Sequence, residues 1–493
     1  MTKKTMKKPL SILYICAFFA LCIIPVAFMF PGIQGPSSEK RDLAPPPVVY
    51  DENGVNYKLP GDISDYFSDH FGLRNYYVTG YAALNYYTLN SSSNEKVIAG
   101  KDGWLFFNET VRDYLGKDLM TPVQIAHIKK TLELQKEYLD SQNVAFIFTL
   151  AANKNSLYGE YMPPWYVKAS PNSNRQLLAE SLKGSDVIYA DLYGALLAHK
   201  GEGQLYHKQD THWNNFGALV GYRELLRNVQ NEVKGFEFDP YENTKYEIKK
   251  EFSGDLAGML LPSAELKDDQ YVYDIGTNYK PDKPIRSPEA MDIITRSKVN
   301  DHRLLIFRDS FANALIPYVS NAFGVVEYSR VFPYDFRLMQ KEKPDVVIEQ
   351  IVERNLPNLL TKAPILPAPL RTLPDTGAED NAIQAKAMSE DAGSYIKIFG
   401  WAHSESAGTD REIYVQLVQG SKSYTFEPFP ILDSDIREQA MKETGLAGIS
   451  DEGFSMMVDK KALPPGEYTI QLVIRDGEKV SRTAPLGSIT IQP

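Results

Sequence analysis

The sequence contains no cysteine after its N-terminal apolar segment. Both cysteines, Cys16 and Cys22, lie within that segment. The rest of the chain therefore has no disulfide framework, no thiol nucleophile and no thiolate metal site. If the protein uses covalent catalysis, serine is the nucleophile left to consider.

The chain also lacks an excess of basic residues. Its formal net charge is −10, from 53 Lys and Arg against 63 Asp and Glu. Residues 1–31 contain four lysines and no acid, so the remainder is four units more negative than the total. A nucleic-acid partner requires a basic face that neutralises phosphates, and this composition argues against one.

Charged residues are absent from positions 10–30 as well. As a helix this segment would be roughly 31 Å long, enough to cross the hydrocarbon core of a bilayer. Lysines precede it and none follows directly, which predicts a cytoplasmic N-terminus and a body outside the cytoplasm. No small-x-small cleavage site follows the segment. We therefore expect residues 1–31 to form a single-pass anchor in the cell membrane, with a removed signal peptide as the alternative.

Composition divides the remaining chain into four parts, and 493 residues with 43% apolar content are consistent with two or three domains. Residues 32–61 begin rich in Pro, Gly and Ser, which predicts a spacer. Residues 62–363 alternate between helical and strand patterns. Residues 364–392 are rich in Pro, Ala, Asp and Glu without periodicity, which indicates a linker. Residues 393–493 contain mainly strand patterns and predict a small β-sandwich.

The strand patterns within 62–363 are short continuous apolar runs, at 144–148, 304–307 and 346–348. Such runs separated by helical stretches are typical of a parallel sheet covered on both faces. The predicted fold class is therefore α/β, followed by a β domain.

Two polar clusters carry the chemistry. Asp210-Thr211-His212 precedes a helical stretch, and Asp309-Ser310 lies between an apolar strand and another helical stretch. A serine needs a histidine to take its proton and a carboxylate to orient that histidine, and the two clusters supply these parts. The amides that begin the second helix are suitable donors to an oxyanion. Helix capping by the same polar residues is the alternative interpretation.

Metal binding by His207, Asp210 and His212 is a further alternative. Their spacing matches no well-attested site, and we predict neither a metal nor another cofactor. Lys154, Asn155 and Tyr158 follow the strand that ends near residue 150, so they are candidates for substrate or oxyanion contacts at the carboxyl edge of the sheet. A polar loop without function is the alternative for these three.

Several motifs occur in an order that resembles a known family. They are Tyr66-Phe67-Ser68-Asp69-His70-Phe71-Gly72-Leu73-Arg74, Gly100-Lys101-Asp102-Gly103-Trp104-Leu105-Phe106-Phe107, the segment 153–163 beginning Asn153-Lys154-Asn155, Asp210-Thr211-His212-Trp213-Asn214 and Asp309-Ser310-Phe311. Over roughly residues 60–360 the chain resembles the SGNH-hydrolase-like proteins of alginate and exopolysaccharide O-acetylation.

The resemblance implies a flavodoxin-like three-layer domain in which Ser310 takes an acetyl group, His212 is the general base and Asp210 orients it. It further implies transfer of the acetyl group to a hydroxyl of an exported or cell-surface polysaccharide, with a multi-span membrane-bound O-acyltransferase as the donor partner. An acetyl esterase with the same triad and a non-catalytic glycan-binding scaffold of an export assembly are the alternative functions.

Two features depart from the family pattern. Arg308 stands where a Gly-Asp-Ser motif has glycine, which puts the second oxyanion donor in doubt. The C-terminal part does not match the family's carbohydrate-binding module. Its aromatic residues Trp401, Tyr424, Phe426 and Phe429 are either stacking faces for a glycan or members of a core.

Overall fold

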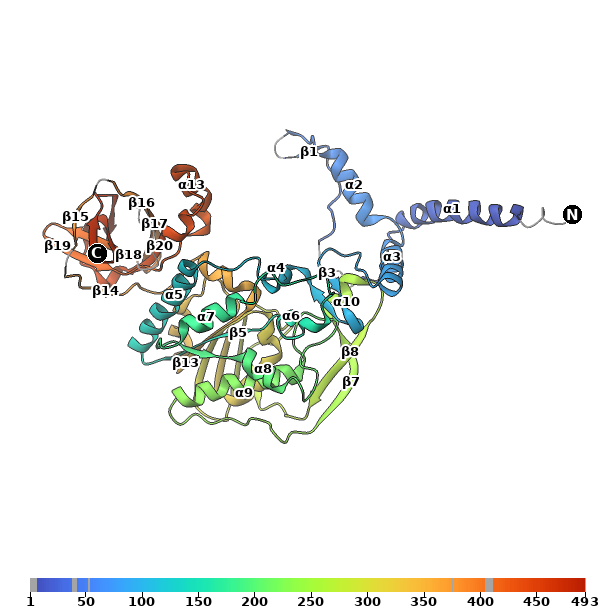
Figure 1. Cartoon of the computed structure of the whole chain (residues 1–493), viewed down its shortest axis with the longest axis horizontal. Coiled ribbons are helices and arrows are strands. Elements are labelled where there is room, and N and C mark those ends of the chain that lie inside the picture. The colour runs from blue at the N-terminus through green and yellow to red at the C-terminus, as the bar shows by residue number, and fades with distance from the viewer. Residues whose placement is uncertain are drawn as a thin grey trace.

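The computed structural model describes residues 7–37, 42–51, 54–374, 376–380, 382–403 and 411–492. An N-terminal helical arm, a central α/β domain and a β-rich C-terminal region follow one another along the chain (Figure 1). The predicted cytoplasmic lysines Lys3 and Lys4 lie outside the described residues.

The N-terminal arm begins with the helix α1 (Lys7–Met29), which projects away from the rest of the molecule (Figure 1). Within the described ranges, one helix is long and apolar enough to cross a membrane, and it is the Ser11–Met29 part of α1. This finding is consistent with the predicted anchor and also with a signal sequence. The arm continues with β1 (Tyr50–Asp51), β2 (Gly54–Val55), α2 (Leu59–His70) and α3 (Arg74–Leu89).

The central sheet has seven strands. Across the sheet they are β6 (Ile188–Ala190), β5 (Ala145–Ala151), β13 (Val346–Val352), β11 (Arg303–Phe307), β12 (Val325–Ser329), β10 (Asp292–Ser297) and β9 (Tyr279–Pro281). The first five are parallel to one another, whereas β10 pairs antiparallel with both β12 and β9. The predicted α/β class is confirmed, but the sheet is not parallel throughout.

The order of the parallel strands also matters for the fold type. Numbered along the chain, their order in the sheet is 2-1-5-3-4. Flavodoxin-like sheets have the order 2-1-3-4-5. The specific flavodoxin-like arrangement is therefore not confirmed.

Helices cover both faces of this sheet, because successive side chains of a strand point to opposite faces. Ile147, Ile306 and Ile348 pack in one cluster with α8 (Leu192–His199), α9 (Asn215–Glu232) and α11 (Ile316–Ala322). Their neighbours Phe148 and Phe307 pack in a second cluster with α5 (Pro122–Ser141) and α7 (Asn174–Leu182). The sheet is thus the middle layer of three.

Shorter elements connect these layers. They are β3 (Val97–Ala99), β4 (Leu105–Phe107), α4 (Val111–Tyr114), α6 (Lys154–Leu157), β7 (Tyr246–Ser253), α10 (Asp255–Leu260), β8 (Lys267–Tyr273), α12 (Met339–Glu342) and the 3₁₀ helices η1 (Lys101–Gly103), η2 (Asn108–Thr110), η3 (Gly159–Tyr161), η4 (Ser310–Leu315), η5 (Phe336–Leu338) and η6 (Glu353–Leu360).

The C-terminal region contains two sheets. One has the order β14 (Leu370–Arg371), β19 (Lys422–Phe426), β18 (Arg411–Gln419), β21 (Gly466–Asp476), β22 (Lys479–Arg482) and β15 (Ala378–Glu379), with β23 (Gly487–Ile491) also paired to β21; the other is β16 (Gln384–Ala392), β17 (Tyr395–His403) and β20 (Gly453–Asp459). The helix α13 (Ser434–Thr444) and the 3₁₀ helices η7 (Ile449–Glu452) and η8 (Lys460–Ala462) complete the region. Ile398 of one sheet and Leu417 and Leu472 of the other share one hydrophobic core, as expected for a β-rich domain.

The structure differs from the sequence prediction in the segment 364–392. Composition indicates a linker there, but β14, β15 and β16 lie within it. Alanine is depleted in strands and occupies several positions of β16, so the strand carries a weak signal. The aromatic residues of this region pack inside the protein, since Trp401, Phe426 and Phe429 are buried and Tyr424 packs against the core that contains Phe426.

Candidate active site

Ser310 lies at the carboxyl edge of the central sheet. It begins η4, three residues after β11 ends at Phe307. The preceding Asp309 caps this helix, accepting a hydrogen bond from the Phe311 amide at 2.9 Å. The Val352 amide also donates to Asp309 at 2.6 Å, at the end of the neighbouring strand β13. The serine is therefore held by two adjacent strand ends.

His212 arrives from a loop that ends where α9 begins. Asn214 caps α9 by accepting hydrogen bonds from two amides of its first turn. Between these residues, Trp213 is buried and its indole N–H donates to the carbonyl oxygen of Phe311 at 3.0 Å. The Trp213 and Phe311 rings also pack edge to face. This contact joins the histidine loop to the serine loop.

The three residues predicted as a triad form one hydrogen-bonded chain. His212 Nε2 lies 2.8 Å from Ser310 Oγ, and His212 Nδ1 lies 2.7 Å from Asp210 Oδ1. The same carboxylate oxygen accepts the His212 amide at 2.8 Å. A carboxylate accepts hydrogen bonds, so we assign the proton to Nδ1 and the lone pair to Nε2, facing the serine hydroxyl.

Burial and charge set the protonation of this chain. Burial opposes a charged imidazole, but the hydrogen bond and the charge of Asp210 outweigh it and raise the pKa of His212. Burial likewise opposes the Asp210 carboxylate, yet the His212 side chain and the amides of Asp255 and His212 lower the pKa of Asp210. The site therefore keeps the aspartate ionised and stabilises the imidazolium that forms when the serine loses its proton.

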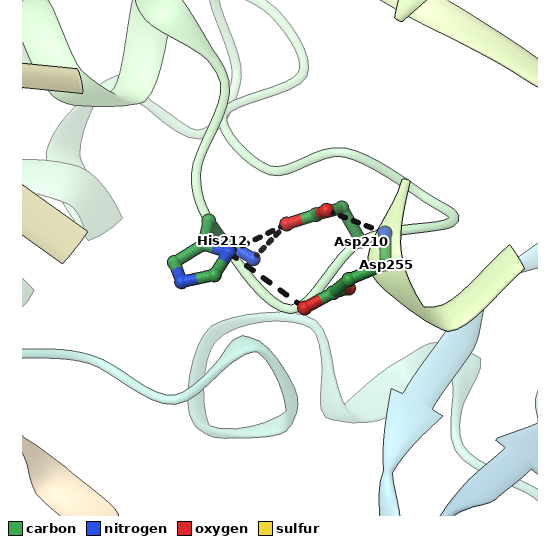
Figure 2. Close-up of side chains that lie close together, drawn as sticks. All are labelled: Asp210, His212 and Asp255. Carbon is green, nitrogen blue, oxygen red and sulfur yellow. Dashed lines mark hydrogen bonds and ion pairs between the residues drawn. The ribbon is translucent and has the colours of Figure 1, made fainter. Parts of the chain in front are cut away.

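Asp255 is a second carboxylate beside the imidazole, and sequence reasoning missed it. Figure 2 shows it on the same side of His212 as Asp210, with its Oδ2 4.0 Å from Nδ1. Burial and the neighbouring Asp210 raise the pKa of Asp255. Its oxygens accept hydrogen bonds from the Thr211 amide at 2.8 Å and the Thr211 hydroxyl at 2.7 Å. It follows a glycine at the start of a short helix, and no motif around it signals this contact.

The alternative of a metal site combines His207 with Asp210 and His212. His207 stacks face to face on Phe252 at 3.7 Å between centroids. Among the described residues, the acidic and histidine side chains close enough to share an ion at this site are Asp210, His212 and Asp255. Each of these three side chains already has hydrogen-bond partners in the protein. His212 Nδ1 bonds to Asp210 Oδ1, Asp210 Oδ2 accepts the Asp255 amide, and Asp255 Oδ2 accepts the Thr211 hydroxyl.

Lys154 lies behind the histidine loop. Its ammonium donates to the carbonyl oxygens of His207, Lys208 and Asp210, at 3.1, 2.9 and 2.5 Å. Burial lowers the pKa of Lys154 to about 7. This side chain fixes the loop that carries Asp210 and His212.

Asn155 and Tyr158 are also directed into the protein. The Asn155 amide donates to Thr110 Oγ1 at 2.8 Å, and the Tyr158 hydroxyl accepts the Leu205 amide at 2.9 Å. Neither they nor Lys154 lines the cleft in front of Ser310. A direct contact of these three residues with substrate stays a prediction, and the structure gives them supporting positions.

A cleft of about 710 Å³ opens in front of Ser310 and His212. The N-terminal arm supplies Pro36 and Ser37 to its wall, and the end of β7 and the turn that follows it supply Ser253 and Gly254. Ser310 and His212 thus face a space large enough for a sugar unit and an acyl group.

Arg308 does not occupy the place of an oxyanion donor. Its guanidinium donates to Asn313 at 2.5 Å and to the carbonyl oxygens of Pro288 and Ala290. In the described part of the chain, the Ser310 amide has no hydrogen-bond acceptor. This amide therefore remains a suitable donor to an oxyanion.

Arg354 is a cation near the site that sequence reasoning missed. It follows β13, and its guanidinium lies 5.6 Å from the Phe311 ring centroid and 5.7 Å from that of Phe107. Burial lowers its pKa. Its charge opposes that of the His212 imidazolium.

Comparison with known proteins confirms the family resemblance. Residues 97–288 match the family model described as "SGNH hydrolase-like domain, acetyltransferase AlgX". The probable alginate O-acetylase AlgJ of Pseudomonas aeruginosa is 25% identical over 227 residues, which is 46% of this chain and 54% of the relative. The corresponding protein of Azotobacter vinelandii is 24% identical over 180 residues, 36% of this chain and 44% of the relative. The chain spans about half the length of the curated relatives it matches.

Solved structures with some similarity include Bacillus cereus PatB1, with a TM-score of 0.42 and 16% identity over 53% of this chain and 96% of that one. The O-acetyltransferase domain of Pseudomonas putida AlgJ has a TM-score of 0.34 and 18% identity, covering 53% of this chain and 92% of that one.

Proposed function

We propose that this chain, which contains an SGNH hydrolase-like domain related to acetyltransferase AlgX, is a polysaccharide O-acetyltransferase. It moves an acetyl group onto sugar hydroxyls through an acetyl-Ser310 intermediate. The observation that carries the proposal is the hydrogen-bonded chain from Ser310 through His212 to Asp210, which opens onto a cleft. The relatives named as probable alginate O-acetylases support the same activity.

In the first half-reaction, His212 Nε2 takes the proton of Ser310 Oγ as this oxygen attacks the acetyl carbonyl carbon of the donor. The carbonyl becomes an oxyanion, to which the Ser310 amide donates. The carbonyl re-forms, the bond between the acetyl carbon and the donor oxygen breaks, and His212 gives its proton to the leaving group. Asp210 stabilises the imidazolium throughout and is not itself protonated.

In the second half-reaction a sugar hydroxyl takes the place of the serine. Its proton passes to His212 Nε2 while its oxygen attacks the acetyl-Ser310 carbonyl. Ser310 Oγ leaves and recovers the proton, and the acetylated sugar departs. Water that enters at this step yields acetate instead, so exclusion of water from the cleft separates a transferase from an esterase.

The proposal includes the setting of the enzyme. The helix α1 is retained as the anchor, and the body lies outside the cytoplasm beside an exported or cell-surface polysaccharide. The acetyl group reaches the cleft from a multi-span membrane-bound O-acyltransferase. The domain is a permuted variant of the flavodoxin-like three-layer fold, in which the Asp-x-His segment precedes the serine.

The full-length chain in detergent or nanodiscs provides the test. It is incubated with an activated aryl acetate, with and without alginate oligosaccharide, and the products are followed by mass spectrometry. Acetylated oligosaccharide, together with a transient acetyl group on the Ser310 peptide, is expected. Acetate released at the same rate with or without sugar would identify an esterase, and absence of turnover would overturn the proposed activity in favour of a non-catalytic role.

A further inference from the structure

The helix α3 presents an uncharged aromatic face to the outside of the molecule. Positions 76, 80, 81, 84 and 87 share one side of the helix at helical spacing. Tyr76, Tyr81, Leu84 and Tyr87 are between 53% and 67% exposed. The one charged residue of α3, Arg74, is buried. We call Tyr76, Gly80, Tyr81, Leu84 and Tyr87 the tyrosine face.

The opposite side of α3 is firmly packed. Ala82 is fully buried in a cluster with Leu105, Leu256 and Leu260. Thr79 Oγ1 accepts the Ser263 amide at 2.9 Å. Since α10 contributes both leucines 256 and 260, α3 rests on the helix that begins with Asp255 of the active site.

The start of α3 is joined to the end of α1. The Gly72 amide donates to the Pro25 carbonyl oxygen at 3.0 Å, and the Leu73 amide donates to Ile33 at 2.7 Å. A Cβ atom at Gly72 would collide with Pro25 and Phe28, so the two segments touch through their backbones. Figure 1 shows α3 running across the end of α1 that lies opposite the N-terminus.

The length of α1 places this junction at a membrane surface. The apolar part of α1 has 19 residues, which as a helix span about 28 Å, close to the hydrocarbon thickness of about 30 Å. A segment joined to the end of such a helix lies at the level of the lipid headgroups. Tyrosine is enriched at that level, because its ring is apolar and its hydroxyl is wet.

We propose that the tyrosine face lies in the headgroup region of the bilayer that α1 spans. The proposal rests on α1 being retained, and it does not require the proposed catalytic activity. The absence of charge on this face suits an amphipathic helix lying in the interface plane. Lipid is the favoured occupant over a protein partner because the end of α1 already sets the face at the bilayer surface.

This placement has a consequence for the cleft. Pro36 and Ser37, which line it, lie on the segment between α1 and α3. The Ser263 hydroxyl donates to the Pro36 carbonyl oxygen at 2.7 Å, which ties that segment to the body. Docking of the tyrosine face would hold one wall of the cleft beside the membrane, where an acyl group delivered from a membrane protein arrives.

The chain's two cysteines both lie in α1, which permits a direct test. In a full-length Cys16→Ser/Cys22→Ser background, single variants Tyr81→Cys and Leu84→Cys receive an environment-sensitive fluorophore. Val299→Cys, at a residue that is 54% exposed and precedes β11, is the matched control. Each protein is reconstituted into phosphatidylcholine nanodiscs with or without headgroup nitroxide lipid.

We expect nitroxide lipid to quench most of the emission at positions 81 and 84 and none at 299. Quenching at 81 and 84 no greater than at 299 would overturn the proposal. If the fluorophores at positions 81 and 84 are shielded from water only when a second membrane protein is reconstituted with the chain, the proposal is overturned in favour of a protein partner. A protein recovered without α1, as judged by intact mass, would also overturn it. Fluorescence is independent of turnover, so failure here and failure of the proposed activity are distinguishable.

Discussion

Removal of the general base tests the proposed mechanism most directly. Ser310 Oγ has one hydrogen-bond partner among the described residues, His212 Nε2 at 2.8 Å. Without that imidazole the hydroxyl keeps its proton at neutral pH. General-base catalysis contributes typically 10²–10⁴-fold, and residues that act as a unit lose about 10³-fold or more when one is removed. At about 1.4 kcal/mol per tenfold, His212→Ala should therefore cost roughly 4 kcal/mol of transition-state stabilisation.

The double variant gives the sharper result. If Ser310 and His212 act as one unit, Ser310→Ala/His212→Ala loses no more kcat than either single variant. Steady-state release of acetate from an aryl ester, with protein folding checked by circular dichroism, measures all three. Ser253→Ala is the matched control, because Ser253 lines the same cleft and its hydroxyl accepts a hydrogen bond from Lys267. Losses that multiply in the double variant, or full activity in either single variant, would refute the shared role.

Three further perturbations follow from the surroundings of the site. The charge of Asp255 raises the pKa of His212, and the rate falls as pH drops through that pKa because an imidazolium accepts no proton. Asp255→Asn should therefore move this acidic limb of the pH–rate profile to lower pH. An unmoved limb would show that Asp255 does not influence the site. Lys154→Met leaves three loop carbonyl oxygens without their donor. It should lower the free energy of unfolding in urea by about 1–3 kcal/mol and lower kcat with little change in KM. An unchanged kcat would show that the lysine does not position the loop. Arg175→Ala leaves the buried Glu353 carboxylate without its ion-pair partner at 2.7 Å and should destabilise the fold by about 3–5 kcal/mol. The double variant Arg175→Met/Glu353→Gln removes the unpaired charge and should recover stability. No recovery would contradict this cause.

The sequence predicts those parts of the site that carry a chemical signature. Asp210, His212 and Ser310 are residue types that acyl transfer requires, and each stands before a helical stretch. Asp255 has no such signature, since it contacts His212 through folding of a distant segment. The position of Lys154 after β5 makes it a candidate, but the sequence does not show that its ammonium faces backbone carbonyl oxygens.

Strand direction could not be predicted as well as strand position. Buried parallel strands are continuous apolar runs, and β5, β11 and β13 have that pattern. The edge strand β9 contains Pro281 and only three residues, so its pattern is too short to recognise. Its antiparallel direction, like that of β10, depends on how the intervening chain returns to the sheet, and no local pattern records this.

The site has two halves, the histidine loop that carries Asp210 and His212 and the serine loop that carries Ser310. Both are positioned by the central sheet, so their order in the sequence matters little. The strands β5, β13 and β11 are neighbours in the sheet, and their carboxyl ends lie on one edge. After β5, Lys154 holds the histidine loop; at the end of β13, the Val352 amide holds Asp309; after β11 comes Ser310. Three adjacent strand ends thus fix both halves, and the Trp213–Phe311 contact aligns them. Because the sheet supplies the geometry, the order of the two segments along the chain does not decide whether the hydrogen-bonded chain forms, in agreement with the several residue orders in which such triads occur.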